Sequence, residues 1–185
     1  MASREVQREK VIQTLADHVL RNGLGKTSLK QLAAAAGTSD RMLLYYFSDK
    51  IDIMAMVLGR VAEQFSQALD QAMPPDRLPA EQLLMQVSTL VRSPAMRPTM
   101  RLWLDMVVAA ARQEPPFPAI AAAVLQQLMG WIESRLEGSA GQQRSQTAAL
   151  LLAIVDGIAL FDMSGGADEA DAVQAALGGL RFTWR

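Results

Sequence analysis

Apolar residues recur three and four positions apart along the chain, and no stretch alternates apolar and polar residues as a half-buried strand does. This spacing predicts an all-α fold. Prolines and glycines divide the pattern into segments, because proline is tolerated in the first turn of a helix and glycine commonly follows the last. We therefore expect helices over 3–22, 29–36, 40–47, 50–73, 79–92, 119–137, 142–163 and 167–180. A further helix is expected to begin between residues 94 and 98 and to end at residue 112.

The residue types available for chemistry exclude several kinds of site. The chain has no cysteine and one histidine, His18, which excludes disulfides, zinc–thiolate sites and multi-histidine metal sites. We also find no nucleophile–base pair and no phosphate-binding loop, and we expect no enzyme, no cofactor and no metal. The charged N-terminus lacks the apolar core of a signal peptide. The most hydrophobic run, 147–161, looks too short to span a membrane, so we expect a cytoplasmic protein.

Charge is distributed unevenly along the chain. Residues 1–50 carry eight basic and five acidic side chains, including all four lysines, whereas the remainder carries ten arginines and fourteen acids. A basic N-terminal part on an acidic body indicates that the N-terminal part meets a polyanion. A surplus of three basic charges also arises by chance. The uneven charge therefore only supports the helix-turn-helix motif described next.

Residues 27–50, TSLKQLAAAAGTSDRMLLYYFSDK, predict a helix-turn-helix. Thr27 or Ser28 caps the first short helix and Ser39 the second, and Gly37 in the turn can adopt a left-handed conformation. Small alanines allow the two helices to cross closely. The expected inward residues are Leu29, Leu32, Ala33, Ala36, Leu43 and Phe47, and the expected outward ones are Asp40, Arg41, Met42, Leu44 and Tyr45.

Residues 4–60 resemble the N-terminal domain of TetR-type regulators. The likeness rests on a basic amphipathic first helix, a Thr/Ser-capped helix containing Leu-Ala, Ala-Gly-Thr-Ser at the turn and Leu-x-Tyr-x-Phe-x-x-Lys after it. The dipeptide Asp156-Gly157 in the penultimate helix also resembles one found in these regulators. The resemblance implies a three-helix DNA-binding domain over 1–50, followed by a helical effector-binding and dimerisation domain over 51–185.

The resemblance also implies which residues touch double-stranded DNA: Ser28, Lys30, Ser39, Asp40, Arg41, Met42, Leu44, Tyr45 and Lys50. Hydroxyl groups and Lys50 suit phosphates, whereas Lys30 and Arg41 suit guanine edges. Leu44 stands where a tyrosine is usual, so its expected role is contact with a thymine methyl group. For Met42 and Leu44 the alternative is core packing. Asp40 accepts from a cytosine amine or caps its helix, and we favour the cap.

The helix over 142–163 is apolar on nearly every face and therefore needs cover on two sides. We expect Leu150, Ile154 and Phe161 to face their own domain. The other side would form a homodimer interface, which two DNA-reading heads require, although a buried central helix in a monomer is the alternative. The expected interface residues are Leu151, Leu152, Val155, Ala159, Val173, Ala176, Leu177 and Leu180.

Methionine and tryptophan in the middle helices suit either an adaptable apolar cavity or plain core. The expected ligand-binding residues are Trp103, Met106, Leu128, Trp131 and Ile154, with Arg101 and Asp105 as polar anchors or solvated charges. Together with the resemblance, this implies a DNA-binding regulator, and the expected form is a repressor released from a palindromic operator by a small apolar ligand. The alternative is a dimeric DNA-binding protein without an effector. Ligand, operator, regulated genes and the choice between repressor and activator do not follow from the residues.

Overall fold

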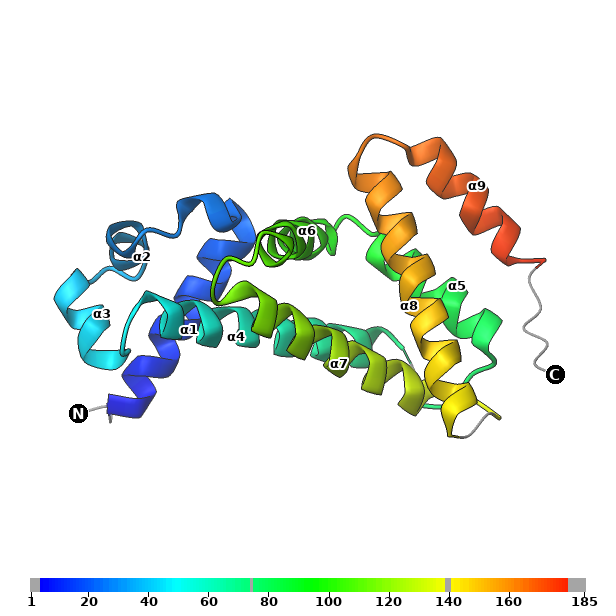
Figure 1. Ribbon diagram of the computed structural model, residues 1–185, viewed down its shortest axis with the longest axis horizontal. Helices are drawn as coiled ribbons and strands as arrows, with labels where there is room; N and C mark the ends of the chain where they lie inside the picture. Colours follow the sequence, from blue (N-terminus) through cyan, green and yellow to red (C-terminus); the bar gives the residue numbers. More distant parts are fainter. Residues whose placement is uncertain (1–3, 74, 139–140, 180–185) are drawn as a thin grey trace. The chain divides into compact units, whose positions relative to one another are not determined.

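The computed structural model describes residues 4–73, 75–138 and 141–179, and over these residues the all-α fold is confirmed (Figure 1). The expected helices form, with ends shifted by a few residues, and a short 3₁₀ helix was not expected. In chain order the elements are α1 (Arg4–Asn22), η1 (Leu24–Lys26), α2 (Leu29–Ala35), α3 (Asp40–Tyr46), α4 (Lys50–Ala72), α5 (Ala80–Val91), α6 (Arg97–Ala111), α7 (Phe117–Arg135), α8 (Gln142–Met163) and α9 (Ala167–Leu177).

The described residues form two compact units. The first comprises those of 1–65 and 101–124, and the second those of 66–100 and 125–185. This is a division by packing, whereas the boundary expected between residues 50 and 51 is a functional one and stays a prediction. The helices α4, α6 and α7 each contribute residues to both units.

The core of the first unit joins residues from distant parts of the sequence. Buried side chains of α1, α2, α3 and α4 form one cluster with residues of α6 and α7. The α6 and α7 members are Leu102, Met106 and Ala121. Segments that the sequence analysis assigned to the body therefore complete the core beneath the helix-turn-helix.

In the second unit α5, α8 and α9 pack on one another (Figure 1). One side of α8 is buried there, through Thr147, Ala148, Leu151, Leu152, Val155, Ile158 and Ala159. With 22 residues α8 is, among the described helices, the one long and apolar enough to cross a membrane, so the expectation that its apolar run is too short was wrong. A core helix of a soluble protein meets the same criterion of length and composition.

Candidate DNA-binding surface

The predicted inward faces of α2 and α3 pack together. Leu32 and Leu43 are fully buried, and Ala33 and Phe47 are nearly so, in one cluster with Leu15 of α1. Gly37 in the turn has a φ of 63°, in the left-handed region that glycine adopts without strain. These residues therefore form the helix-turn-helix that the sequence predicted.

Side-chain caps define where α2 and α3 begin. The Ser28 hydroxyl accepts from the Gln31 backbone N–H (3.3 Å), while the Gln31 side chain accepts from the Ser28 backbone N–H (3.1 Å). This capping box satisfies two N–H groups that lack partners within the helix, and it makes Ser28, not Thr27, the cap. At α3 the Ser39 hydroxyl accepts from the Met42 backbone N–H (3.3 Å). The cap favoured for Asp40 was wrong, since Asp40 is the first residue inside α3.

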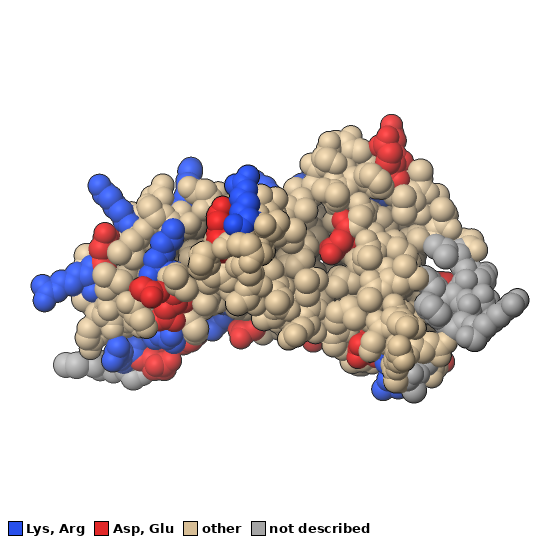
Figure 2. Space-filling view, viewed as in Figure 1, with Lys and Arg blue, Asp and Glu red and all other residues tan. Residues whose placement is uncertain are grey.

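The outward face of α3 carries large apolar side chains in contact with solvent. Met42 is 40% exposed, Leu44 47% and Tyr45 56%, so the core alternative for Met42 and Leu44 was wrong. All nine predicted contact residues are exposed. Lysine and arginine side chains project around α2 and α3 at the left of the view (Figure 2). The structure thus presents a basic surface with apolar side chains within it, and DNA contact by these residues stays a prediction.

Two arginines near the start of α1 stack on aromatic rings at the end of α3, which the sequence analysis missed. The Arg4 guanidinium lies 4.7 Å from the Tyr45 ring centroid and donates to the Tyr45 carbonyl oxygen (2.8 Å). The Arg8 guanidinium lies 5.1 Å from the Phe47 ring centroid. The spacing of four residues places Arg4 and Arg8 on one face of α1, but it gives no signal of the rings that they contact.

The turn after α1 is held by α6. Arg101 donates to the Arg21 carbonyl oxygen (3.0 Å), and the Leu24 backbone N–H donates to the Asp105 carboxylate (3.4 Å). The His18 ring lies 3.1 Å from the Lys26 carbonyl oxygen, so this ring also contacts the turn after α1. Arg101 and Asp105 are therefore not free charges, and a role as ligand anchors stays a prediction. They position the end of α1.

The helix α4 is tied to α1 by polar pairs. Arg60 forms an ion pair with Glu9, and the Gln64 side chain donates to the Gln13 side chain (3.0 Å). The hydrogen bond to Glu9 is the main cause that raises the pKa of Arg60. Arg60 therefore stays charged, and the pair helps to hold α1 where it supports α2 and α3.

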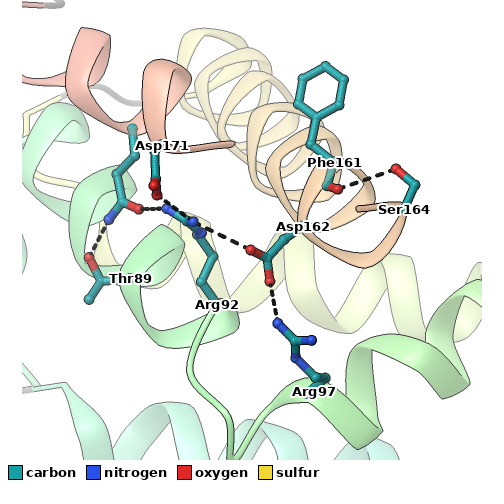
Figure 3. Close-up of polar contacts among 8 residues, drawn as sticks. Thr89, Arg92, Arg97, Phe161, Asp162, Ser164 and Asp171 are labelled. Atoms are coloured by element: carbon teal, nitrogen blue, oxygen red, sulfur yellow. Dashed lines mark hydrogen bonds and ion pairs between the residues drawn. The ribbon is translucent and has the colours of Figure 1, made fainter. Parts of the chain in front are cut away.

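A polar cluster links the helices of the second unit (Figure 3). Arg92, after the last residue of α5, donates to Asp171 (2.6 Å) and to Asp162 (3.4 Å), and Arg97 donates to the other Asp162 oxygen (3.2 Å). The hydrogen bond to Asp171 is the main cause that raises the pKa of Arg92. A depression beside this cluster has no enclosed space for a water molecule, and it is lined by Val91, Arg92, Arg97, Met100, Ala159, Asp162 and Met163.

Comparisons with known proteins agree on the architecture. No family model matches the chain. It is 25% identical over 165 residues to the HTH-type transcriptional regulator PksA of Bacillus subtilis (strain 168), covering 86% of this chain and 80% of that protein. A structure from Rhodococcus sp. named as a TetR-family transcriptional regulator is 17% identical, with a TM-score of 0.71 over 94% of this chain and 95% of that one. The multidrug binding protein EbrR, complexed with proflavin, is 21% identical, with a TM-score of 0.70 over 95% and 99%.

The chain has the TetR-regulator fold. The resemblance seen in residues 4–60 is thereby confirmed for the fold, and it extends beyond the helix-turn-helix to the helical body. The predicted ligand-binding and dimer-interface residues lie on this fold as follows.

The predicted ligand residues are distributed over both units. Trp103 and Met106 pack in the core of the first unit. In the second unit the Trp131 indole N–H donates to Asp70 (2.8 Å), and the Arg135 guanidinium lies 5.2 Å from its ring. Leu128 and Ile154 are half-buried. None of these five lines the depression beside Arg92, and their role in ligand binding stays a prediction.

Most of the residues predicted for the dimer face are buried in the single chain and not exposed as an interface requires. Leu151, Leu152, Val155 and Ala159 are buried within the chain itself, as is Leu177 of α9. The large apolar side chains that α8 exposes are Leu150 (41%), Leu160 (51%) and Phe161 (42%). Ala176 is exposed and Val173 half-buried, while Leu180 lies outside the described residues. A helix without a polar face gives no sequence signal that distinguishes its two sides.

Proposed function

We propose that this protein is a cytoplasmic DNA-binding transcriptional regulator that reads its operator with α3. The observation that carries the proposal is the exposure of Met42, Leu44 and Tyr45 on a helix that a helix-turn-helix presents outward. Apolar and aromatic side chains on a basic surface are suited to thymine methyl groups and sugars in the major groove. The similarity to regulators with the same fold supports this function.

Charged and hydroxyl groups divide into two roles. Arg41 and Lys30 suit the acceptor atoms of guanine, which differ between base pairs, so they would contribute specificity. Tyr45, Lys50 and the capping serines suit phosphate oxygens, which are the same at every position and so contribute affinity. The nine predicted contacts therefore serve both sequence preference and general affinity for duplex DNA.

The first experiment selects duplexes from a random DNA library with the full-length protein and titrates variants against the selected duplex. Lys50→Ala should weaken binding to all sequences alike and reduce the salt slope by about one unit, as loss of one phosphate contact does. Arg41→Ala should relax base preference at one position in each half-site. Arg77→Ala removes an exposed cation outside the helix-turn-helix and is the matched control. Wild-type protein that enriches no duplex would contradict the proposed function.

The regulator acts as a homodimer on a palindromic operator in this proposal. Two heads related by a two-fold axis match two half-sites in successive major grooves. The exposed apolar face of α8, with Leu150, Leu160 and Phe161, supports an interface there. The small exposed residues of α9, Ala172, Ala175 and Ala176, would allow close approach of the partner.

A small apolar or amphipathic ligand releases this regulator from DNA in the same proposal, which makes it a repressor. The proflavin complex of EbrR supports ligand binding by this fold. A ligand acts only through its different affinity for the DNA-bound and free conformations, and coupling of about 1–3 kcal/mol would lower operator affinity roughly 5–150-fold. A fluorescence screen of hydrophobic compounds on Trp103 and Trp131, followed by operator titration, tests this. No compound changing DNA affinity would favour the regulator without an effector.

A further inference from the structure

Tyr45 is held by contacts on its ring and on its backbone, although it is the most exposed of the large apolar side chains described (56%). The Arg4 guanidinium lies over its ring at 4.7 Å, and the Tyr46 ring meets it edge-on, with centroids 5.3 Å apart and planes at 71°. An exposed side chain ordinarily samples several rotamers, and ordering it on binding costs free energy. Stacking on Arg4 restricts the ring before any ligand arrives.

Arg4 also stabilises the end of α3. The Tyr45 carbonyl is among the last four of α3, which have no partner within the helix, and Arg4 donates to its oxygen at 2.8 Å. A cation at a helix C-terminus is also favoured by the helix dipole. One side chain from the first turn of α1 therefore orients both the Tyr45 ring and the Tyr45 backbone, across 41 positions of sequence.

The neighbouring pair shows why Arg4 differs from an ordinary packing residue. Arg8 stacks on Phe47 at 5.1 Å, but Phe47 is only 2% exposed and belongs to the core. Arg8 therefore covers a buried ring. Arg4 instead orders a ring whose hydroxyl group is a hydrogen-bond donor on the surface that faces the proposed operator.

We infer that Arg4 is a positioning residue that holds the Tyr45 hydroxyl ready to donate to a phosphate of duplex DNA. The inference rests on the proposed function, since it requires DNA on the α3 surface. The phosphate diester is the group that suits this donor, because it accepts from a phenol at any sequence position. Arg4 thus contributes general affinity through Tyr45 and leaves base preference unchanged.

A double-mutant cycle on a duplex selected by the wild-type protein tests the inference. Arg4→Ala should weaken binding about three- to tenfold, the size expected from losing a stacked cation and one hydrogen bond that order the tyrosine. In the Tyr45→Phe background, which lacks the hydroxyl, the same change should weaken binding by less than about twofold. Arg4→Lys should restore part of the affinity, because an ammonium also stacks on the ring but lacks the planar guanidinium. Lys10→Ala is the control, because Lys10 is an exposed cation of α1 whose side chain makes no contact among the described residues.

Tyrosine-specific NMR gives a readout without DNA. The chain has two tyrosines, Tyr45 and Tyr46, so ring-labelled protein gives two sets of signals that Tyr45→Phe assigns. Arg4→Ala should shift the Tyr45 ring signals, and Lys10→Ala should leave them in place. Unchanged DNA binding by Arg4→Ala, or an equal loss in the Tyr45→Phe background, would overturn this inference alone. Wild-type protein that binds no selected duplex would overturn the proposed function and this inference with it.

Discussion

Gly23 connects the end of α1 to the 3₁₀ helix in a conformation that other residues rarely adopt. Its φ is 69°, and a Cβ added there would lie 2.8 Å from an oxygen of Asp105. The same carboxylate accepts from the Leu24 backbone N–H. Two independent constraints, one from the backbone and one from α6, therefore favour glycine at this position.

Gly23→Ala should lower the free energy of unfolding by about 1–3 kcal/mol, because the side chain adds left-handed strain and a close contact. Thermal or urea unfolding measures the change. Gly25→Ala is the matched control, since an added Cβ there meets no heavy atom within 4 Å. Equal losses in the two variants would contradict this account of the turn.

Arg92 illustrates a charge held by several partners. Asp162 and Asp171 both accept from it, and Arg97 shares Asp162 (Figure 3). The pKa of Arg92 is higher in the folded state than in the unfolded state. The stability that charged Arg92 contributes is therefore fully present below its pKa in the unfolded state. That stability is lost only as pH rises through the strongly basic pKa of the folded state. Titration of Arg92 itself therefore leaves this contribution constant near neutrality.

Arg92→Met should lower the free energy of unfolding by about 1–3 kcal/mol, the loss expected when charged hydrogen bonds are removed. The difference from wild type should stay constant between about pH 6 and pH 9, well below the range in which a guanidinium titrates. Urea unfolding of both proteins across this range measures it. A difference that disappears by about pH 9 would contradict the role assigned to Arg92.

At the scale of elements, α8 shows two different apolar sides. Ala159 is 6% exposed and lines the depression beside Arg92 and Arg97, whereas the adjacent Leu160 is 51% exposed. The two residues are neighbours in sequence but point to opposite environments, because successive helical residues are rotated by about 100°. They make a matched pair for separating the packing of α8 from its proposed contact with a partner.

Ala159→Arg should destabilise the chain itself by several kcal/mol, because it places a third cation against Arg92 and Arg97 in a close-packed site. Circular dichroism during thermal unfolding measures the loss. Leu160→Arg is the control and should retain native helicity, since its side chain lies in solvent within one chain. An Ala159→Arg protein as stable as the wild type would contradict the buried position of Ala159.

At the scale of the whole molecule, the proposed function as a regulator depends on two copies. The exposed face of α8 supports a homodimer, and a charge introduced into an apolar interface carries a large desolvation penalty. A protein whose single chain folds normally but does not pair would bind one half-site only, and weakly. The interface can therefore be tested without disturbing the fold.

Leu160→Arg should sediment as a monomer at concentrations where the wild type is a dimer, and it should lose most of its affinity for a selected palindrome. Gln126→Arg, which adds a cation at an exposed position of α7 in the second unit, is the control for general effects of charge. A Leu160→Arg protein that remains dimeric would exclude this face as the interface and leave the helix-turn-helix assignment intact.

Helix positions and the inward face of the helix-turn-helix were predictable because their causes are local. The Ser28 cap acts over three residues, Gly37 acts at one, and Leu43 and Phe47 share a face through helical periodicity. Tertiary structure alone decided which side of α8 is buried, since an evenly apolar helix carries no directional signal. It also decided that Trp131 meets Asp70 and that Arg4 meets Tyr45, 61 and 41 positions apart. Such contacts depend on how whole helices pack, and no spacing along the chain encodes that packing.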